Sequence, residues 1–371
     1  MKKILTLSLT LALVLGVLAK PKKVVMIAGK QSHGPLSHEH KAGIMLLAKC
    51  LKEGASKLVA PTVVLNGWPE DNGIFDGADA VVIYSDGGGR HPALGGNNLE
   101  ILGKLMDKGI GFLTIHYAVE PTTNKGNKEF IKWQGGCFET HWSVNPHWVA
   151  NFKKLPKHPI TQGVKPFKAN DEWYFHMRFA PEMKGVTPIL SDVAPKETMK
   201  RRDGAHSGNP AVRKSVTSGE LQHVAWAFER PNGGRGFGFT GGHNHLNWGE
   251  DNFRKTVLNA IVWVAKAEVP KGGVPSKLVE KDLYANLDNK GRKPKPRSNP
   301  GPKPSGKVTG PKPVAESKLI TKNTGPAKLE AKIKGAKELH LVVTDGGNGY
   351  SCDWADWAQP MLIDEAGTQT K

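Results

Sequence analysis

Histidine is the residue type that offers this chain the most chemistry, because histidines recur in short segments rich in glycine and polar residues. They lie at His33, His38, His40, His91, His116, His141 and His243. A neutral imidazole binds zinc and similar metals, and it also exchanges protons near neutral pH. We predict a divalent metal, with zinc as the first candidate, on His38, His116 and His141, with His243 next. The alternative for any one of them is a structural histidine held by hydrogen bonds.

Carboxylates beside aromatic residues form the second group that could do chemistry. Asp171 and Glu172 directly precede Trp173 and Tyr174. A carboxylate in this position can orient a metal-binding imidazole or move a proton, although a solvated strand end is the alternative. The predicted catalytic residues are His116, Asp171, Glu172 and His243.

The elements that must position these side chains alternate between strand and helix patterns. Short apolar runs rich in β-branched residues predict buried strands, and apolar residues at helical spacing predict helices. The predicted strands cover 22–29, 59–65, 78–84 and 111–116, and the predicted helices cover 41–51 and 97–108. This order predicts an α/β fold with a parallel sheet covered by helices on both faces. Ligands bind such sheets at the carboxyl ends of the strands, where the histidine segments follow.

The pattern of residues 137–266 is less regular. Residues 137–190 hold many aromatics and predict strands and loops laid over the edge of the sheet. Strand patterns at 223–229 and 236–240 flank Asn232-Gly233, a pair typical of hairpin turns. Helical spacing over 252–266 predicts a closing helix that ends before Pro270.

Several motifs in the same order along the chain carry a family resemblance. They are His33-Gly34-Pro35 with His38-Glu39-His40, Thr114-Ile115-His116-Tyr117-Ala118, Gly135-Gly136-Cys137-Phe138-Glu139-Thr140-His141, Asp171-Glu172-Trp173-Tyr174 and Thr240-Gly241-Gly242-His243. With these motifs, residues 22–268 resemble the ThuA-like (trehalose utilisation) family.

The resemblance implies a flavodoxin-like sheet related to that of class I glutamine amidotransferases. It also implies a link to the use of trehalose and other sugars, and some members of the family hold a metal at this site. Exposed aromatic faces stack on sugar rings, and acidic side chains bind sugar hydroxyls. The predicted substrate-binding residues are therefore His40, Tyr117, Glu139, Trp142 and Trp173. The alternative for each tryptophan is packing in the core or under a lid.

The cysteines argue against amidotransferase chemistry. Those enzymes place a nucleophilic cysteine at a tight turn after a central strand, where this chain has His116. Cys50 falls on a predicted helix and Cys137 in a different loop, and an imidazole cannot supply thiolate chemistry. We therefore predict that the protein is not a cysteine-dependent amidotransferase. Because the chain has three cysteines, at least one of Cys50, Cys137 and Cys352 is unpaired.

The chain divides by composition into four parts: a signal peptide at 1–19, a ThuA-like domain at 20–270, a linker rich in proline, lysine and glycine at 271–315, and a β module at 316–371. The module resembles the start of an NPCBM-type carbohydrate-binding module. The residues that carry this resemblance are Leu341-Val342-Val343-Thr344-Asp345-Gly346-Gly347 and Asp353-Trp354-Ala355-Asp356-Trp357-Ala358. The C-terminal part of such a module has no counterpart here, so we predict a short all-β C-terminal segment.

The N-terminus has the pattern of an export signal. Lys2 and Lys3 precede an apolar run from Ile4 to Leu18, and a small residue, Ala19, follows. The alternative is a membrane anchor, but a run of about 15 residues is short for a membrane span. We predict an exported protein, periplasmic or extracellular, with no transmembrane segment after cleavage.

The basic charge of the chain does not indicate a nucleic-acid partner. The formal net charge is +18, and residues 267–340 alone hold 17 Lys and Arg against 7 Asp and Glu. Such a run is usually a solvated linker, and no nucleic-acid-binding motif accompanies it. We predict no specific nucleic-acid binding, although opposite charge allows loose contact with anionic envelope polymers.

These observations together predict a protein of carbohydrate metabolism. The first hypothesis is a metal-assisted enzyme that acts on a sugar or keto-sugar, with lyase, isomerase and hydrolase chemistry all left open. The alternative is a non-catalytic glycan-binding protein of the cell envelope, and a structural envelope protein is the third possibility. In each case the expected partner is a carbohydrate small molecule or glycan, and the sequence does not determine the oligomeric state.

Overall fold

The computed structural model describes residues 20–290, 315 and 328–333, and the backbone of residues 362–363 and 369–370. The chain divides into two compact units, Met1–Gly291 and Arg292–Lys371. The predicted signal peptide, residues 291–314 of the predicted linker and nearly all of the predicted β module lie outside the described residues. In the second unit, β12 (Leu362–Ile363) and β13 (Gln369–Thr370) form an antiparallel pair.

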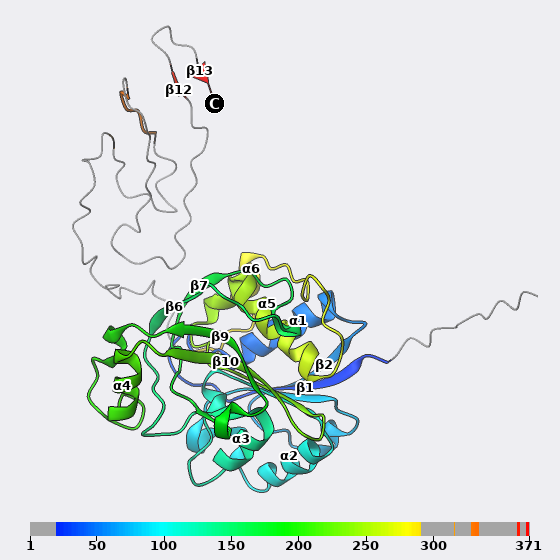
Figure 1. The fold of residues 1–371 in the computed structure, drawn as a ribbon. Coiled ribbons are helices and arrows are strands. Elements are labelled where there is room, and N and C mark those ends of the chain that lie inside the picture. The colour runs from blue at the N-terminus through cyan, green and yellow to red at the C-terminus, as the bar shows by residue number, and fades with distance from the viewer. Residues whose placement is uncertain (1–19, 291–314, 316–327, 334–361, 364–368, 371) are drawn as a thin grey trace, which may run out of the picture. The chain divides into compact units, whose positions relative to one another are not determined.

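A seven-stranded sheet in the order β2-β1-β3-β4-β11-β10-β9 forms the centre of the first unit (Figure 1). The strands are β1 (Lys22–Ala28), β2 (Val59–Val64), β3 (Ala80–Tyr84), β4 (Gly111–Ile115), β9 (Val186–Val193), β10 (Leu221–Glu229) and β11 (Arg235–Phe239). Neighbours from β2 to β11 are parallel, and β10 pairs antiparallel with both β11 and β9. The predicted α/β fold is confirmed, with a mixed edge added to the parallel sheet.

Helices cover both faces of this sheet because its strands are apolar on both sides. In β1, Val24, Met26 and Ala28 join one core and Val25 and Ile27 join the other. The first core packs against α1 (His40–Gly54) and α5 (Asp251–Val264), and the second packs against α2 (Asn98–Asp107) and α3 (Asn127–Gln134). Alternate residues of one strand therefore support opposite helical layers, as parallel sheets require.

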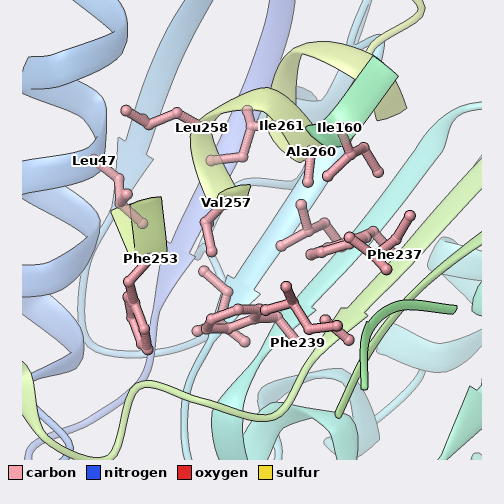
Figure 2. Packing of buried hydrophobic residues seen from close by; sticks show 14 of the residues in the cluster. Leu47, Ile160, Phe237, Phe239, Phe253, Val257, Leu258, Ala260 and Ile261 are labelled. Carbon is pink, nitrogen blue, oxygen red and sulfur yellow. The ribbon is translucent and has the colours of Figure 1, made fainter. Parts of the chain in front are cut away.

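The α5 side of the core is the larger of the two clusters. Phe253, Val257 and Ile261 on α5 face Phe237 and Phe239 on β11, all of them fully buried (Figure 2). The ring centroids of Phe239 and Phe253 lie 5.0 Å apart in an edge-to-face arrangement. This packing ties the closing helix to the strand that leads into the Gly241-Gly242-His243 segment.

The middle of the chain lies beside the sheet, as its irregular pattern predicts. Two small antiparallel pairs form there, β5 (Gly136–Cys137) with β8 (Arg178–Phe179) and β6 (Trp148–Phe152) with β7 (Phe167–Asp171). Sequence patterning did not predict α3 or α4 (Pro210–Thr217), since each has only eight residues. Their ends are set locally: Gly126 and Gly135 flank α3 with positive φ, and the Asn209 side chain caps α4.

Short 3₁₀ helices make up most of the remaining turns. They are η1 (Asn72–Phe75), η2 (Gly88–Arg90), η3 (Pro92–Leu94), η4 (His116–Val119), η5 (Pro159–Thr161), η6 (Pro181–Met183), η7 (Lys196–Met199) and η8 (His245–Gly249). Two of them, η4 and η8, begin at or just after segments that carry predicted site histidines.

Residues 271–290, which the composition assigns to the linker, belong to the first unit. Val274 is fully buried, and its N–H donates to the Asn259 side chain of α5. The segment continues through the short α6 (Glu280–Leu283), and Lys49 of α1 pairs with Asp282. The described helices include none that is both long and apolar enough to cross a membrane.

Candidate functional site

The candidate site lies at the carboxyl ends of the parallel strands, where three histidine segments meet. His38 follows β1, His116 follows β4 directly, and His243 follows β11. The backbone of His38 and His116 has positive φ, 49° and 57°. Such a conformation costs a non-glycine residue on the order of 1 kcal/mol and persists only where its surroundings enforce it. The fold therefore holds both imidazoles in place rather than leaving them on free loops.

Asp86 fixes the orientation of His38. The Nδ1 atom of His38 lies 3.0 Å from Oδ1 of Asp86, which follows β3. Because an ionised carboxylate only accepts hydrogen bonds, Nδ1 carries the proton and Nε2 carries a lone pair. Both side chains are buried, so water does not compete for this contact.

A backbone carbonyl fixes His116 in the same way. Its Nδ1 lies 2.8 Å from the Thr240 carbonyl oxygen, which can only accept. The Nε2 atom of His116 is therefore also unprotonated, and it lies 3.1 Å from Nε2 of His38. Two lone pairs that face each other inside the protein repel, and either a hydrogen-bond donor to each nitrogen or a cation between them offsets that repulsion.

His243 and Glu172 complete the cluster. Nδ1 of His243 lies 3.1 Å from Nε2 of His38 and 3.0 Å from Oε2 of Glu172. The ligand atoms of His38, His116, His243 and Glu172 all lie within 4.8 Å of one another. Nearby, the Tyr174 hydroxyl lies 3.3 Å from Nε2 of His116 and 3.4 Å from Oε2 of Glu172. We call these four ligand residues the His₃Glu cluster.

The electrostatics of the cluster disfavour a second proton on the imidazoles of His38 and His116. Burial, followed by the neighbouring histidines, lowers the pKa of both His38 and His116 far below the ordinary value of 6.5. Burial alone would raise the pKa of Glu172, but its hydrogen bond with His243 and the electrostatic effect of the neighbouring histidines lower it overall. His38 and His116 are therefore neutral and Glu172 is ionised, the protonation states in which such side chains bind metals.

His141, a predicted metal ligand, is not part of this cluster. Its side chain is exposed, and its backbone N–H donates to the Ala205 carbonyl at 2.7 Å. His243 and Glu172 take the places beside His38 and His116 for which the sequence favoured His141. The pattern failed because His141 lies in a turn after β5, outside the edge where the parallel strands end.

Two residues of the Asp171–Tyr174 motif are structural. Asp171 is fully buried and accepts from the backbone N–H groups of Gly242 and Asn244 and from the Asn247 side chain. Burial raises its pKa. Asp171 thus organises the backbone that carries His243 instead of facing a substrate. Trp173 is fully buried in the core, with its indole N–H on the Ala169 carbonyl, so it cannot stack on a sugar.

The other predicted substrate contacts lie around the cluster in different environments. Glu139 pairs with both Nε and Nη2 of Arg178, and that guanidinium stacks 3.8 Å from the ring centroid of the partly exposed Trp142. His40 is fully buried, with Nδ1 3.0 Å from the Lys30 carbonyl oxygen. Only Tyr117 borders the cluster with an accessible edge: its ring centroid lies 6.0 Å from that of His38, and burial raises its pKa to about 12.

The predicted site residues did not include Asp86, Tyr174 or His147, which all contact the cluster. Asp86 lies in the glycine-rich segment directly after a predicted strand, which is the signal that could have identified it. His147 is about half exposed; its ring lies 4.7 Å from that of His243, and its Nε2 lies 3.9 Å from Oε1 of Glu172. No motif pointed to His147, since it comes beside Glu172 only through the antiparallel pairing of β6 with β7.

Two open cavities lie near this edge of the sheet. One, of about 230 Å³, is lined by Glu172 and His147 together with Asn145, Pro146, Glu197, Thr198, Lys200 and Arg201. The other, of about 530 Å³, is lined by Gly88, Glu120, Pro121, Thr122, Thr123, Asn124 and Thr140. The first reaches a residue of the His₃Glu cluster, so it offers a ligand a route to the cluster.

Family models match two parts of the chain. The ThuA model, described as trehalose utilisation, matches residues 25–264, and the NPCBM/NEW2 domain model matches residues 307–363. No curated protein matches the chain.

Solved structures similar to this chain include two ThuA-like proteins. The protein from Bacteroides uniformis has 16% identity and a TM-score of 0.47, over 66% of this chain and 93% of its own. The protein from Parabacteroides merdae has 17% identity and a TM-score of 0.43, over 70% of this chain and 94% of its own.

Proposed function

Because the chain belongs to the ThuA (trehalose utilisation) family, we propose that it is a metal-assisted enzyme that acts on a sugar or keto-sugar. The family and the NPCBM match support a carbohydrate-related function. Enzyme activity, metal dependence and export are the parts that we add. The export proposal is supported by the basic and apolar N-terminus, Lys2 to Ala19.

One observation carries the metal proposal: the unprotonated Nε2 atoms of His38 and His116 face each other at 3.1 Å. Hydrogen bonds from His243 and Tyr174 could satisfy each nitrogen singly, but they place no positive charge between the two. A divalent cation would satisfy both nitrogens at once, together with Nδ1 of His243 and Oε2 of Glu172. Imidazole and carboxylate ligands suit zinc and other first-row transition metals.

The residues around the ligands also fit a metal site. Metal-binding histidines usually donate their second ring N–H to a carboxylate or a carbonyl, which fixes the tautomer. His38 donates to Asp86, and His116 donates to the Thr240 carbonyl. Both imidazoles are thereby set with the lone pair toward the centre of the cluster.

When bound, a divalent metal supplies a Lewis acid that polarises a carbonyl or acidifies a hydroxyl. The residues of the chain would then move the protons. His147, half exposed and beside Glu172, can exchange a proton with a sugar in the adjoining cavity. The exposed Arg201 on the cavity wall offers a charged hydrogen-bonding partner for sugar hydroxyls, and Asn145 links it to Glu172.

Metal analysis combined with activity tests this proposal. We expect the purified protein to contain about one equivalent of a transition metal, and turnover of at least one member of a panel of disaccharides and keto-disaccharides to stop with a chelator. His116→Ala should lose the metal, whereas the matched variant His141→Ala, at an exposed histidine, should keep it. A metal-free protein that also fails to bind added zinc would refute the proposal.

A second candidate function is glycan binding without catalysis. The NPCBM/NEW2 match at residues 307–363 favours it. Tryptophans in the first unit give it little support, because Trp148, Trp173 and Trp248 are buried. Glycan binding on a sugar array that is unchanged in His38→Ala and His116→Ala, without turnover of any panel member, would favour this function over the enzyme.

A further inference from the structure

Lys290 lies far along the chain from the site, yet its side chain is inserted beside the His38 segment, residues 33–40. The Lys290 side chain is 3% exposed, and its Nζ lies 3.1 Å from Oε1 of Glu39. The ammonium also donates to three backbone carbonyls, at 2.6 Å to Ser37 and 3.3 Å to Gly34 and His38. A long flexible side chain is rarely buried without such partners, because burial of an unpaired charge is very costly.

The His38 segment needs such a clamp because its backbone is strained. His33, Leu36 and His38 all have positive φ, between 49° and 62°. Each of these conformations is unfavourable for a residue with a Cβ, so the segment alone would prefer other structures. Carbonyls that point to one spot repel each other, and the Lys290 ammonium neutralises that repulsion.

Glu39 links the clamp to both segments. Its Oε1 accepts from the Leu36 N–H at 2.9 Å, and its Oε2 accepts from the Asp288 N–H at 3.0 Å. Glu39 is 1% exposed, so its carboxylate is the counter-ion of Lys290 inside the protein. The pair adds no net charge beside the cluster, and its effect is to hold positions.

The segment that carries Lys290 also contacts the loop of His243. Nε2 of His245 lies 2.9 Å from the Leu283 carbonyl, and the His245 N–H donates to the Leu36 carbonyl. The His38 N–H in turn donates to the His243 carbonyl at 3.2 Å. Residues 283–290, which we call the strap, thus hold together the two segments that bring His38 and His243 to the cluster.

We propose that Lys290 is a positioning residue for the His₃Glu cluster, and that the strap is part of the site although it lies beyond residue 264, where the family match ends. This inference rests on the proposed function, since the cluster is where a metal would bind. Lys290 touches no ligand atom. It acts through the backbone of residues 34–38, which sets where the His38 imidazole points.

Full-length Lys290→Met removes the charge and keeps most of the side-chain volume. We expect its zinc affinity, measured by competition with a chromophoric chelator, to fall by about 10- to 100-fold, the usual effect of losing a supporting contact around a metal ligand. The visible spectrum of the cobalt-loaded variant should also change, because that spectrum reports ligand geometry. Amide hydrogen exchange over residues 33–40 should be faster in the metal-free variant.

Two further variants keep the test decisive. Lys49→Met removes a lysine that pairs with Asp282 next to the strap at the surface, and it should behave as wild type. Glu39→Gln with Lys290→Met leaves no buried charge unpaired, so it should fold even if Lys290→Met does not, and it should still bind zinc weakly.

The possible outcomes separate the two proposals. If the wild type binds no zinc, the proposed function fails, and this inference fails with it. If the wild type binds zinc, and a folded variant without Lys290 binds it equally well with unchanged exchange over residues 33–40, only the positioning role of Lys290 is overturned.

Discussion

At the scale of single residues, the tautomers of two imidazoles decide what the site can do. Asp86 and the Thr240 carbonyl each take the Nδ1 proton of one histidine, and both Nε2 lone pairs are left facing each other. The same residues with free tautomers could form an ordinary hydrogen-bonded chain of histidines. The residues that orient the ligands therefore matter as much as the ligands.

Asp86→Ala tests this dependence on orientation. The variant lets the His38 proton move to Nε2, where it would block metal binding, so zinc affinity should fall by about 10- to 100-fold. The measurement is chelator competition with the purified variant. Asp107→Ala is the matched control, since Asp107 is largely exposed on α2 and should leave the affinity unchanged. Wild-type affinity in Asp86→Ala would mean that His38 is not a ligand.

Position after a strand, more than residue type, explains which site residues could be predicted. His38, His116 and His243 come together because each follows a parallel strand, and those strands end at one edge of the sheet. Asp86 was missed because its role depends on a partner 48 residues away. Trp173 was predicted to bind sugar but is fully buried, because aromatic type alone does not distinguish a residue that stacks on a sugar from a core residue.

At the scale of elements, strands and helices with strong periodicity were predictable, and short ones were not. The apolar runs that became β1, β3 and β4 are buried on both faces, so their sequence pattern is nearly continuous. By contrast, α4 has eight residues, and its ends are fixed by Asn209 and by tertiary contacts. The mixed edge of the sheet at β9 also depends on long-range pairing that no local pattern encodes.

The buried side chains of α5 pack on β11, the strand that leads to His243. Phe253→Ala should lower the free energy of unfolding by about 3–5 kcal/mol, because Phe253 is fully buried between Trp173, Phe239 and Trp248. Urea unfolding followed by circular dichroism measures this. Leu221→Ala, at a leucine that is 61% exposed on β10, should change it by less than about 0.5 kcal/mol. Equal effects of the two variants would contradict this packing.

At the scale of the whole molecule, a count of charges does not show which basic residues are buried. The basic run at 267–340 reads as a solvated linker, yet Lys290 within it is a buried counter-ion of Glu39. A count of charges cannot show this, because it does not tell which lysine forms a buried ion pair with a carboxylate. The NPCBM match at residues 307–363 overlaps the C-terminal part of this run.

The most direct test of the account is a crystal structure of the zinc-loaded protein, with anomalous diffraction recorded on both sides of the zinc absorption edge. We expect one strong peak at about 2.0–2.2 Å from Nε2 of His38, Nε2 of His116, Nδ1 of His243 and Oε2 of Glu172. A peak elsewhere, for example at His141, or a cluster that stays without zinc while its imidazoles keep the contacts described above, would contradict it.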